Sequence, residues 1–233
     1  MPMNKTLSVV IPCYKQAHFL GECIESVLAQ SVKADEIIVV NDGSPDNTSE
    51  VAKKYGVILI EKENGGLSSA RNKGIRESTG NFMLCLDSDD MLRPDAIKEF
   101  LPLMGENNIA QLGLMYFGTQ VATFRPMGAT LESLLQSNSV YCNSVFPKKA
   151  WEKVKYDESD TMRLGLEDWL YWIELAANGY EVKTGDYIAL LYRRHGNAMT
   201  QATTHPRWNE IIEYMSKKIK EILALAEFSA CPS

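Results

Sequence analysis

The sequence has few cysteines, no long hydrophobic run and no excess of positive charge, and each absence excludes a class of protein. Its five cysteines include no C-x-x-C pair, which argues against a zinc site or a disulfide framework and predicts free thiols in the cytoplasm. The longest uncharged stretch, residues 109–124, is interrupted by polar and glycine residues, so no transmembrane helix is expected. The net charge of −6 argues against nucleic-acid binding by phosphate neutralisation.

Two glycine-rich nucleotide motifs are missing as well. After the first predicted strand the sequence reads PCYKQAH at residues 12–18, without the glycines that let a pyrophosphate approach the backbone in G-x-G-x-x-G. The P-loop pattern G-x-x-x-x-G-K-[ST] does not occur in the sequence. The sequence therefore excludes Rossmann-type NAD enzymes and P-loop proteins.

What is present is an ordinary globular composition, 45% hydrophobic and 23% charged over 233 residues. In the first hundred residues, short β-branched runs alternate with segments whose apolar residues recur at helical spacing. The predicted strands are residues 7–12, 36–40, 57–60 and 81–86, and the predicted helices are residues 19–30, 47–56, 68–78 and about 94–105. This alternation predicts an α/β fold with a Rossmann-like, mainly parallel central sheet flanked by helices.

The second half is less regular and is expected to continue the same domain. It contains candidate strands or irregular segments at 113–126, 139–146, 181–184 and 188–194, and candidate helices at 149–154 and 165–178. We predict a single domain over residues 1–206, with halves at 1–108 and 109–206, and a tail at 207–233. The tail has an amphipathic helix over 208–228, whose acidic residues balance its lysines. This balance favours packing or homodimerisation over binding to a lipid surface, with a peripheral position at the inner membrane face left open.

Acidic side chains follow two of the predicted strands, at the sheet edge where ligands of α/β proteins bind. Asp87, Ser88, Asp89 and Asp90 come directly after the fourth strand. Carboxylate oxygens are the ligands that Mg²⁺ and Mn²⁺ prefer, although a turn with capping aspartates is the alternative. Asp42 follows the second strand and suits either a hydrogen bond to a ligand or an ordinary Asp-Gly turn.

Three further places carry candidate chemistry. Arg71 lies one turn into a helix, where a phosphate is favoured, although an exposed arginine there needs no function. Glu167 and Asp168 open the helix at 165–178 beside Trp169. They fit either a general base next to a sugar-holding aromatic ring or acids favoured by the helix dipole. His195 follows a predicted strand and could complete a metal shell or cap a loop.

Taken together, these segments resemble the family 2 glycosyltransferases of the GT-A fold, which are inverting and use nucleotide-sugars. The resemblance extends over about residues 6–200 and rests on five motifs in order. They are SVVIPCY at 8–14, IIVVNDGS at 37–44, GGLSSARN at 65–72, LDSDD at 86–90 and GLEDW at 165–169. The fourth is similar to the family's D-x-D element and the fifth to its E-D element.

The resemblance implies a donor site in the first half of the domain. Its nucleotide-binding residues would be Pro12, Tyr14, Asp42, Arg71, Asp87 and Ser88. Pro12 and Tyr14 would line a uracil pocket, and Asp42 would accept a hydrogen bond from the base. Asp89 would bind the Mn²⁺ or Mg²⁺ that bridges the diphosphate, with His195 as a looser match for a second ligand.

The resemblance also implies the chemistry and the second substrate. Asp168 would be the base that deprotonates an acceptor hydroxyl, supported by Glu167, and Trp169 would contact the acceptor. A divalent ion offsets the charge that grows on the leaving diphosphate. The second half would bind the acceptor, which is a glycan, a lipid-linked glycan or another hydroxyl compound of polysaccharide or glycoconjugate biosynthesis. The identity of the transferred sugar stays open. The nucleotide of the donor also stays open among UDP, GDP and dTDP, and we prefer UDP.

Two alternatives to this function are weighed, and one departure from the family pattern limits it. A nucleotidyltransferase acting on a sugar phosphate usually needs a glycine-rich loop after the first strand, which is absent from the sequence. A catalytically silent nucleotide-sugar-binding module would not need Asp168. Processive relatives carry Q-x-x-R-W, but here five residues separate Gln201 from Arg207. We therefore predict a single-addition enzyme.

Overall fold

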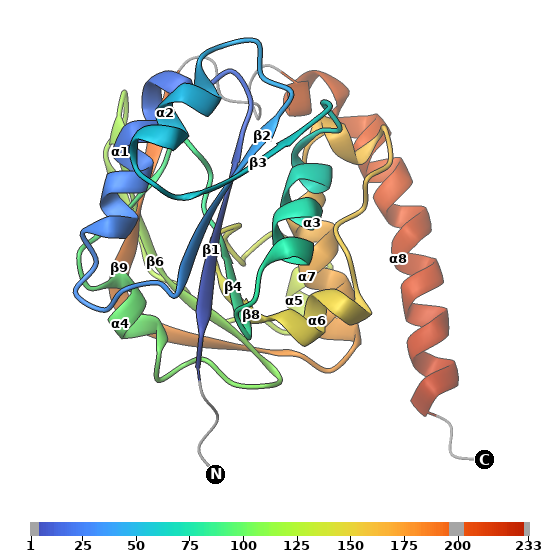
Figure 1. Cartoon of the computed structure of the whole chain (residues 1–233). Coiled ribbons are helices and arrows are strands. Elements are labelled where there is room, and N and C mark those ends of the chain that lie inside the picture. The colour runs from blue at the N-terminus through green and yellow to red at the C-terminus, as the bar shows by residue number, and fades with distance from the viewer. Residues whose placement is uncertain (1–4, 196–202, 231–233) are drawn as a thin grey trace.

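The computed structural model describes residues 5–195 and 203–230. Within these residues it contains a nine-stranded sheet of order β3-β2-β1-β4-β8-β6-β9-β5, with β7 paired to β6. Helices cover both faces of the curled sheet (Figure 1). This arrangement confirms the predicted α/β fold. Gln201 and Cys231 lie outside the described residues, whereas Cys13, Cys23, Cys85 and Cys142 are free thiols as predicted.

The first half of the sheet is parallel and is built from the apolar runs of the sequence. Its strands are β1 (Leu7–Cys13), β2 (Glu36–Asp42), β3 (Ile58–Lys62) and β4 (Phe82–Cys85). β1 pairs in parallel with both β2 and β4, and it is buried along its whole length. Because the strands run in the same direction, the segments that follow β1, β2 and β4 meet at one edge of the sheet.

Helices pack on the two faces of this parallel region. α1 (Ala17–Leu28), α2 (Thr48–Lys54) and α4 (Ala96–Phe100) lie on one face, and α3 (Leu67–Glu77) lies on the other, as Figure 1 shows. α4 is shorter than the predicted helix to about residue 105 and ends at Phe100. Pro102 explains this difference, because proline lacks the N–H that would donate to the carbonyl four residues earlier.

The second half adds antiparallel pairs to the sheet. β8 (Val145–Pro147) is antiparallel to β4, and β6 (Asn108–Gly118) is antiparallel to β8. β9 (Glu181–Arg194) runs parallel to β6, and it joins the two strands predicted at 181–184 and 188–194 into one, with a register irregularity near Gly113. The short strands β5 (Met91–Leu92) and β7 (Ala122–Phe124) complete the sheet.

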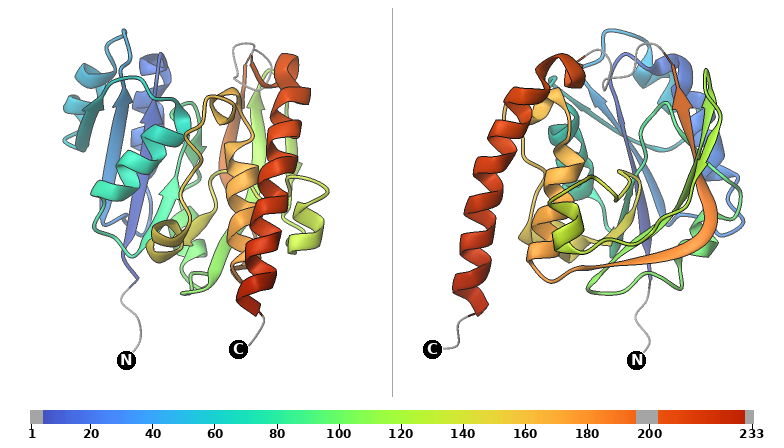
Figure 2. Two further views of the ribbon diagram at one scale, coloured as in Figure 1. Left: turned by 90° about the vertical axis from the view of Figure 1, so that its right-hand side faces the viewer. Right: turned by 180° about the vertical axis from the view of Figure 1, so that it is seen from behind.

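The remaining helices form a layer on the α3 face. They are α5 (Leu131–Leu134), α6 (Lys148–Lys153) and α7 (Glu167–Ala177), with one-turn 3₁₀ helices at Met162–Leu164 and His205–Arg207. α8 (Trp208–Ala230) lies outermost and runs alongside α7 (Figure 2). It buries Ile211 and Met215 in the core of this face, and the Tyr214 hydroxyl donates to Asp157 Oδ2 at 2.7 Å. The tail helix therefore packs on the domain, while the predicted boundary at residue 206 stays a prediction.

Candidate active site

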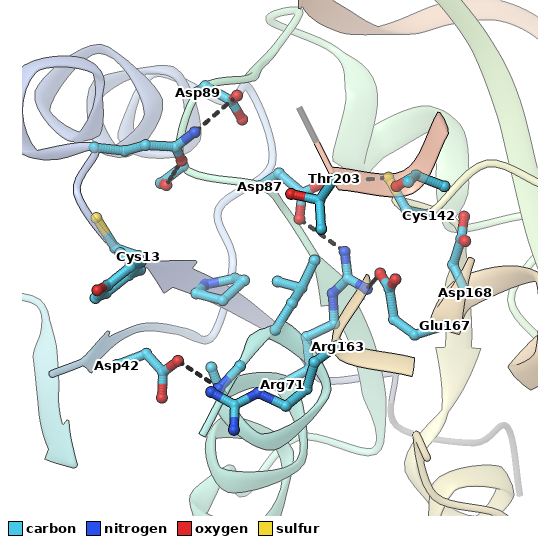
Figure 3. A pocket seen from close by; sticks show the side chains of 18 of the residues that line it. Cys13, Asp42, Arg71, Asp87, Asp89, Cys142, Arg163, Glu167, Asp168 and Thr203 are labelled. Carbon is cyan, nitrogen blue, oxygen red and sulfur yellow. Dashed lines mark hydrogen bonds and ion pairs between the residues drawn. The ribbon is translucent and has the colours of Figure 1, made fainter. Parts of the chain in front are cut away.

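A cleft of about 640 Å³ opens where the parallel strands end. Its walls come from the residues after β1, β2 and β4, from the start of α3 and from the start of α7. Nine of the predicted site residues line it: Pro12, Tyr14, Asp42, Arg71, Asp87, Ser88, Asp89, Glu167 and Asp168. The motifs that are far apart in the sequence thus meet around one cavity (Figure 3).

Arg71 is the central contact of this cleft. Its side chain is only 1% exposed, and its Nη2 lies 2.8 Å from Asp87 Oδ1 while its Nη1 lies 2.6 Å from Glu167 Oε1. The guanidinium also lies over the Tyr156 ring at 5.4 Å. Arg71 therefore joins the segment after β4 to the first turn of α7. Both terminal nitrogens bind carboxylates, and Arg71 also lines the cleft, so its predicted role in nucleotide binding stays a prediction.

The aspartates after β4 have different partners. Asp87 pairs with Arg71, and its Oδ2 also accepts from the Cys142 thiol at 3.5 Å. Asp89 Oδ2 accepts from Gln16 Nε2 at 3.0 Å. Asp90 is buried and accepts from the Arg193 backbone N–H at 2.8 Å. Asp87 therefore has a cationic donor, whereas Asp90 has one backbone donor and its Oδ2 has no hydrogen-bond partner within the described residues. Asp87 and Asp89 both line the cleft.

Asp89 and His195 fit a divalent-cation site. His195 Nε2 lies 2.9 Å from Asp89 Oδ2, and both side chains are partly exposed. Burial raises the pKa of the Asp89 carboxyl, Asp87 adds to this effect, and His195 opposes it. The described residues contain no cluster of three or more such ligands. One carboxylate and one imidazole suit Mn²⁺ or Mg²⁺ when diphosphate oxygens and water fill the other positions.

At the end of the cleft that is remote from Asp89, Asp42 binds the residues around it through several hydrogen bonds. The Asp42 side chain is 4% exposed. Oδ1 accepts from Lys62 Nζ at 2.6 Å and from the Gly65 N–H at 2.9 Å. Oδ2 accepts from the Gly66 N–H at 2.8 Å and from Asn64 Nδ2 at 3.2 Å. Asp42 thereby holds the glycine turn that leads into α3.

The E-D pair stands at the start of α7, directly after a strained residue. Leu166 adopts a left-handed conformation with φ of 63°, which costs a non-glycine residue about 1–2 kcal/mol. This turn presents Glu167 and Asp168 to the cleft. Asp168 Oδ2 accepts from Asn138 Nδ2 at 3.3 Å, and Oδ1 accepts from the Trp169 N–H at 2.8 Å. Within the described residues, Asp168 has no ion-pair partner.

Burial is the largest influence on the pKa of both acids. It raises the pKa of Glu167, and Arg71 opposes this effect. Burial also raises the pKa of Asp168, with Arg71 and the Asn138 hydrogen bond acting in the opposite direction. The direct contact with Arg71 keeps Glu167 occupied as an ion-pair partner. Asp168 differs from Glu167 in that no ion pair engages its carboxylate within the described residues.

Two predicted site residues do not line the cleft as the described residues form it. His195 reaches the site through its contact with Asp89. Trp169 lies on the α5 side of α7, where its indole N–H donates to the Leu134 carbonyl at 2.7 Å. A role for Trp169 in acceptor binding stays a prediction.

The structure adds lining residues that sequence reasoning missed. They include Gln16, Asn64, Asn138, Cys142, Arg163, Tyr192, Thr203 and Thr204. Asn64 directly precedes the motif GGLSSARN at 65–72, so its place next to the cleft could have been predicted from the sequence. Thr204 reaches the cleft because its Oγ1 donates to the Leu164 carbonyl at 2.8 Å, and no local pattern indicates this contact.

The sequence profile described as Glycosyl transferase family 2 matches residues 8–171, and the chain belongs to this family. Over 155 residues it is 35% identical to the uncharacterized glycosyltransferase RP339 of Rickettsia prowazekii, covering 66% of this chain and 44% of that protein. The chain therefore spans less than half of the length of this relative.

Two solved structures share the fold. S. aureus TarS 1–349 in complex with UDP-GlcNAc superposes with a TM-score of 0.73 at 20% identity, covering 97% of this chain and 73% of that one. The mannosyltransferase PcManGT from Pyrobaculum calidifontis, in complex with GDP-Man and Mn²⁺, superposes with a TM-score of 0.63 at 16% identity. The match covers 100% of this chain and 77% of that one. None of the helices in the described part of the chain has the length and apolar character needed to cross a membrane.

Replacing Arg71 should destabilise the fold strongly. Arg71→Met leaves the buried Glu167 and the partly buried Asp87 without their cation, and breaking a buried pair in this way costs about 3–5 kcal/mol. Urea unfolding measures this loss. Arg76→Met on the exposed face of α3 is the matched control and should change stability by less than about 0.5 kcal/mol. Equal stability of the two variants would contradict the bridging role.

Proposed function

We propose that this chain is an inverting, metal-assisted glycosyltransferase that moves one sugar from a UDP-sugar to an acceptor hydroxyl. The observation that carries this proposal is the contrast between the two acids at the start of α7. Arg71 binds Glu167 at 2.6 Å, whereas Asp168 faces the same cleft with only neutral hydrogen-bond donors. An unpaired, partly desolvated carboxylate is suited to act as a general base.

The proposed reaction needs one base. A sugar hydroxyl is a poor nucleophile near neutral pH, so Asp168 takes its proton as the oxygen attacks the anomeric carbon. The new bond forms on the side opposite the departing diphosphate, and a single displacement of this kind inverts the anomeric configuration. Glu167 does not accept the proton; through Arg71 it holds the first turn of α7 in place.

The donor would lie along the cleft from Asp42 to Asp89. Pro12 and the half-exposed Tyr14 ring offer surfaces for a base, while Ser88 is held in place by its hydrogen bond to Gln16. Asp89 and His195 would hold Mn²⁺ or Mg²⁺ at the other end. When bound, the ion supplies positive charge to the leaving diphosphate. The UDP-GlcNAc and GDP-Man complexes of the two fold neighbours support a nucleotide-sugar in this place.

The acceptor would enter beside Asp168. Asn138, Cys142 and Thr203 line the cleft there. We propose a glycan, a lipid-linked glycan or another hydroxyl compound as the acceptor, with Trp169 as a peripheral contact. The outward surface of α8 is the proposed site of a homodimer.

Removing the base should abolish transfer and spare donor binding. We expect Asp168→Asn to lower the rate of UDP release in the presence of Mn²⁺ and acceptor by about 10²–10⁴-fold. Its affinity for UDP, measured by calorimetry, should stay within about twofold, because the amide is isosteric. Asp160→Asn, at a fully exposed position, is the control and should keep wild-type turnover. Turnover by Asp168→Asn near the wild-type rate would refute Asp168 as the base.

Metal dependence can be measured without turnover. Calorimetry should show that Mn²⁺ raises the affinity of the wild-type protein for UDP at least about tenfold over the value with EDTA, since the ion offsets the diphosphate charge in an acidic cleft. Asp89→Ala should lose most of this gain. The metal assignment fails if wild-type affinity is the same with Mn²⁺ and with EDTA.

A further inference from the structure

Arg163 lies at the end of the cleft that is opposite the proposed metal site. It belongs to the 3₁₀ turn Met162–Leu164, which precedes α7. Its Nη2 donates to Asn64 Oδ1 at 2.9 Å, and Asn64 Nδ2 in turn donates to the Asp42 carbonyl at 2.9 Å. Figure 3 shows the Arg163 side chain extending towards Asp42. A residue of the second half thus lies over the nucleotide-binding half.

The glycine turn before α3 makes room for this side chain. A Cβ at Gly66 would lie 3.0 Å from both Cγ and Nε of Arg163, so any side chain at this position would compete with the arginine for space. Gly66 also has a φ of 87°, which favours glycine. The arginine stem therefore lies directly against the backbone of the turn that Asp42 holds.

The guanidinium of Arg163 keeps donors available for a ligand. A guanidinium has five N–H groups, and Asn64 takes one of them. The nearest carboxylate, Asp160, is 3.9 Å away and fully exposed, so this contact is weak and screened. The Arg163 side chain is 38% exposed and lines the cleft. Arg71 differs, because its side chain is 1% exposed and both terminal nitrogens bind carboxylates.

The carboxylate of Asp42, in contrast, has no unused site for accepting a further hydrogen bond. An ionised carboxylate offers about four lone-pair sites. Lys62 and the Gly65 N–H occupy Oδ1, while the Gly66 N–H and Asn64 occupy Oδ2. A base that donated to Asp42 would have to displace one of these donors. A base that presents a carbonyl oxygen would instead meet the unused donors of Arg163.

We propose that Arg163 reads the nucleobase of the donor by donating to the carbonyl oxygen at position 4 of a uracil ring. This inference rests on the proposed function, because it needs a nucleotide in the cleft. If the diphosphate lies near Asp89 and the ribose near Asp87, as the proposed function requires, the base edge remote from the ribose would lie towards Arg163, at the other end of the cleft. Uracil has an acceptor at position 4, whereas cytosine has an amino group there, so Arg163 discriminates UDP from CDP.

Calorimetry with Mn²⁺ tests this role using UDP, CDP and inorganic diphosphate as probes. Wild-type protein should bind UDP more tightly than CDP. Arg163→Gln should weaken UDP binding about tenfold or more, since a hydrogen bond from a charged donor is lost. The UDP-to-CDP affinity ratio should fall towards one, and diphosphate binding should stay unchanged. Arg163→Lys keeps the charge but loses the planar fork, so its UDP affinity should be intermediate.

The outcomes separate this inference from the proposed function. Arg76→Gln, on the exposed face of α3 and outside the cleft, is the control and should bind all three probes as the wild type does. Equal losses of UDP and diphosphate affinity in Arg163→Gln would show a phosphate contact and overturn base reading. Unchanged UDP affinity in a protein that binds UDP would overturn this inference alone. A wild-type protein that binds no nucleotide would overturn both.

Discussion

The buried guanidinium of Arg71 is the interaction on which the rest of the site depends. It joins Asp87, 16 residues further along the chain, to Glu167, which is 96 residues away. Burying the charges of Arg71 and Glu167 beside the partly buried Asp87 is unfavourable unless their geometry and hydrogen bonds are good, and here each terminal nitrogen is within 2.8 Å of a carboxylate oxygen. The position of α7 relative to the parallel sheet is therefore set by an ion pair as well as by apolar packing.

This bridge also differentiates the acids that surround the cleft. Asp87 and Glu167 share a cation, Asp42 binds a turn and a lysine, and Asp89 meets an imidazole. Asp168 is left with neutral donors in a desolvated position. Neighbouring acids with different partners can take different roles, and the acids around this cavity differ in their partners in this way. A diphosphate enters such a cavity most readily together with a divalent cation.

The sequence predicted those parts of the protein that depend on local pattern. The apolar runs that became β1, β2 and β4 and the residues that follow them were recognisable without coordinates, because parallel strands bring their carboxyl ends to one edge. The contact of Arg71 with Glu167 and the position of Arg163 over Gly66 join segments about a hundred residues apart, and no spacing rule encodes such contacts. The same reason explains why β9 appeared as two strands: its continuity comes from pairing with β6.

The most direct test of the central proposal, that Asp168 is the unpaired base, is the pH dependence of kcat/KM measured at several Mn²⁺ concentrations. The protonated acid cannot take a proton, so activity should fall as pH decreases through the pKa of Asp168. Because burial raises this pKa, the midpoint should lie above the ordinary aspartate value of about 4 and should not move with Mn²⁺ concentration. Activity that stays constant down to about pH 4, or a midpoint that follows the Mn²⁺ concentration, would contradict the account.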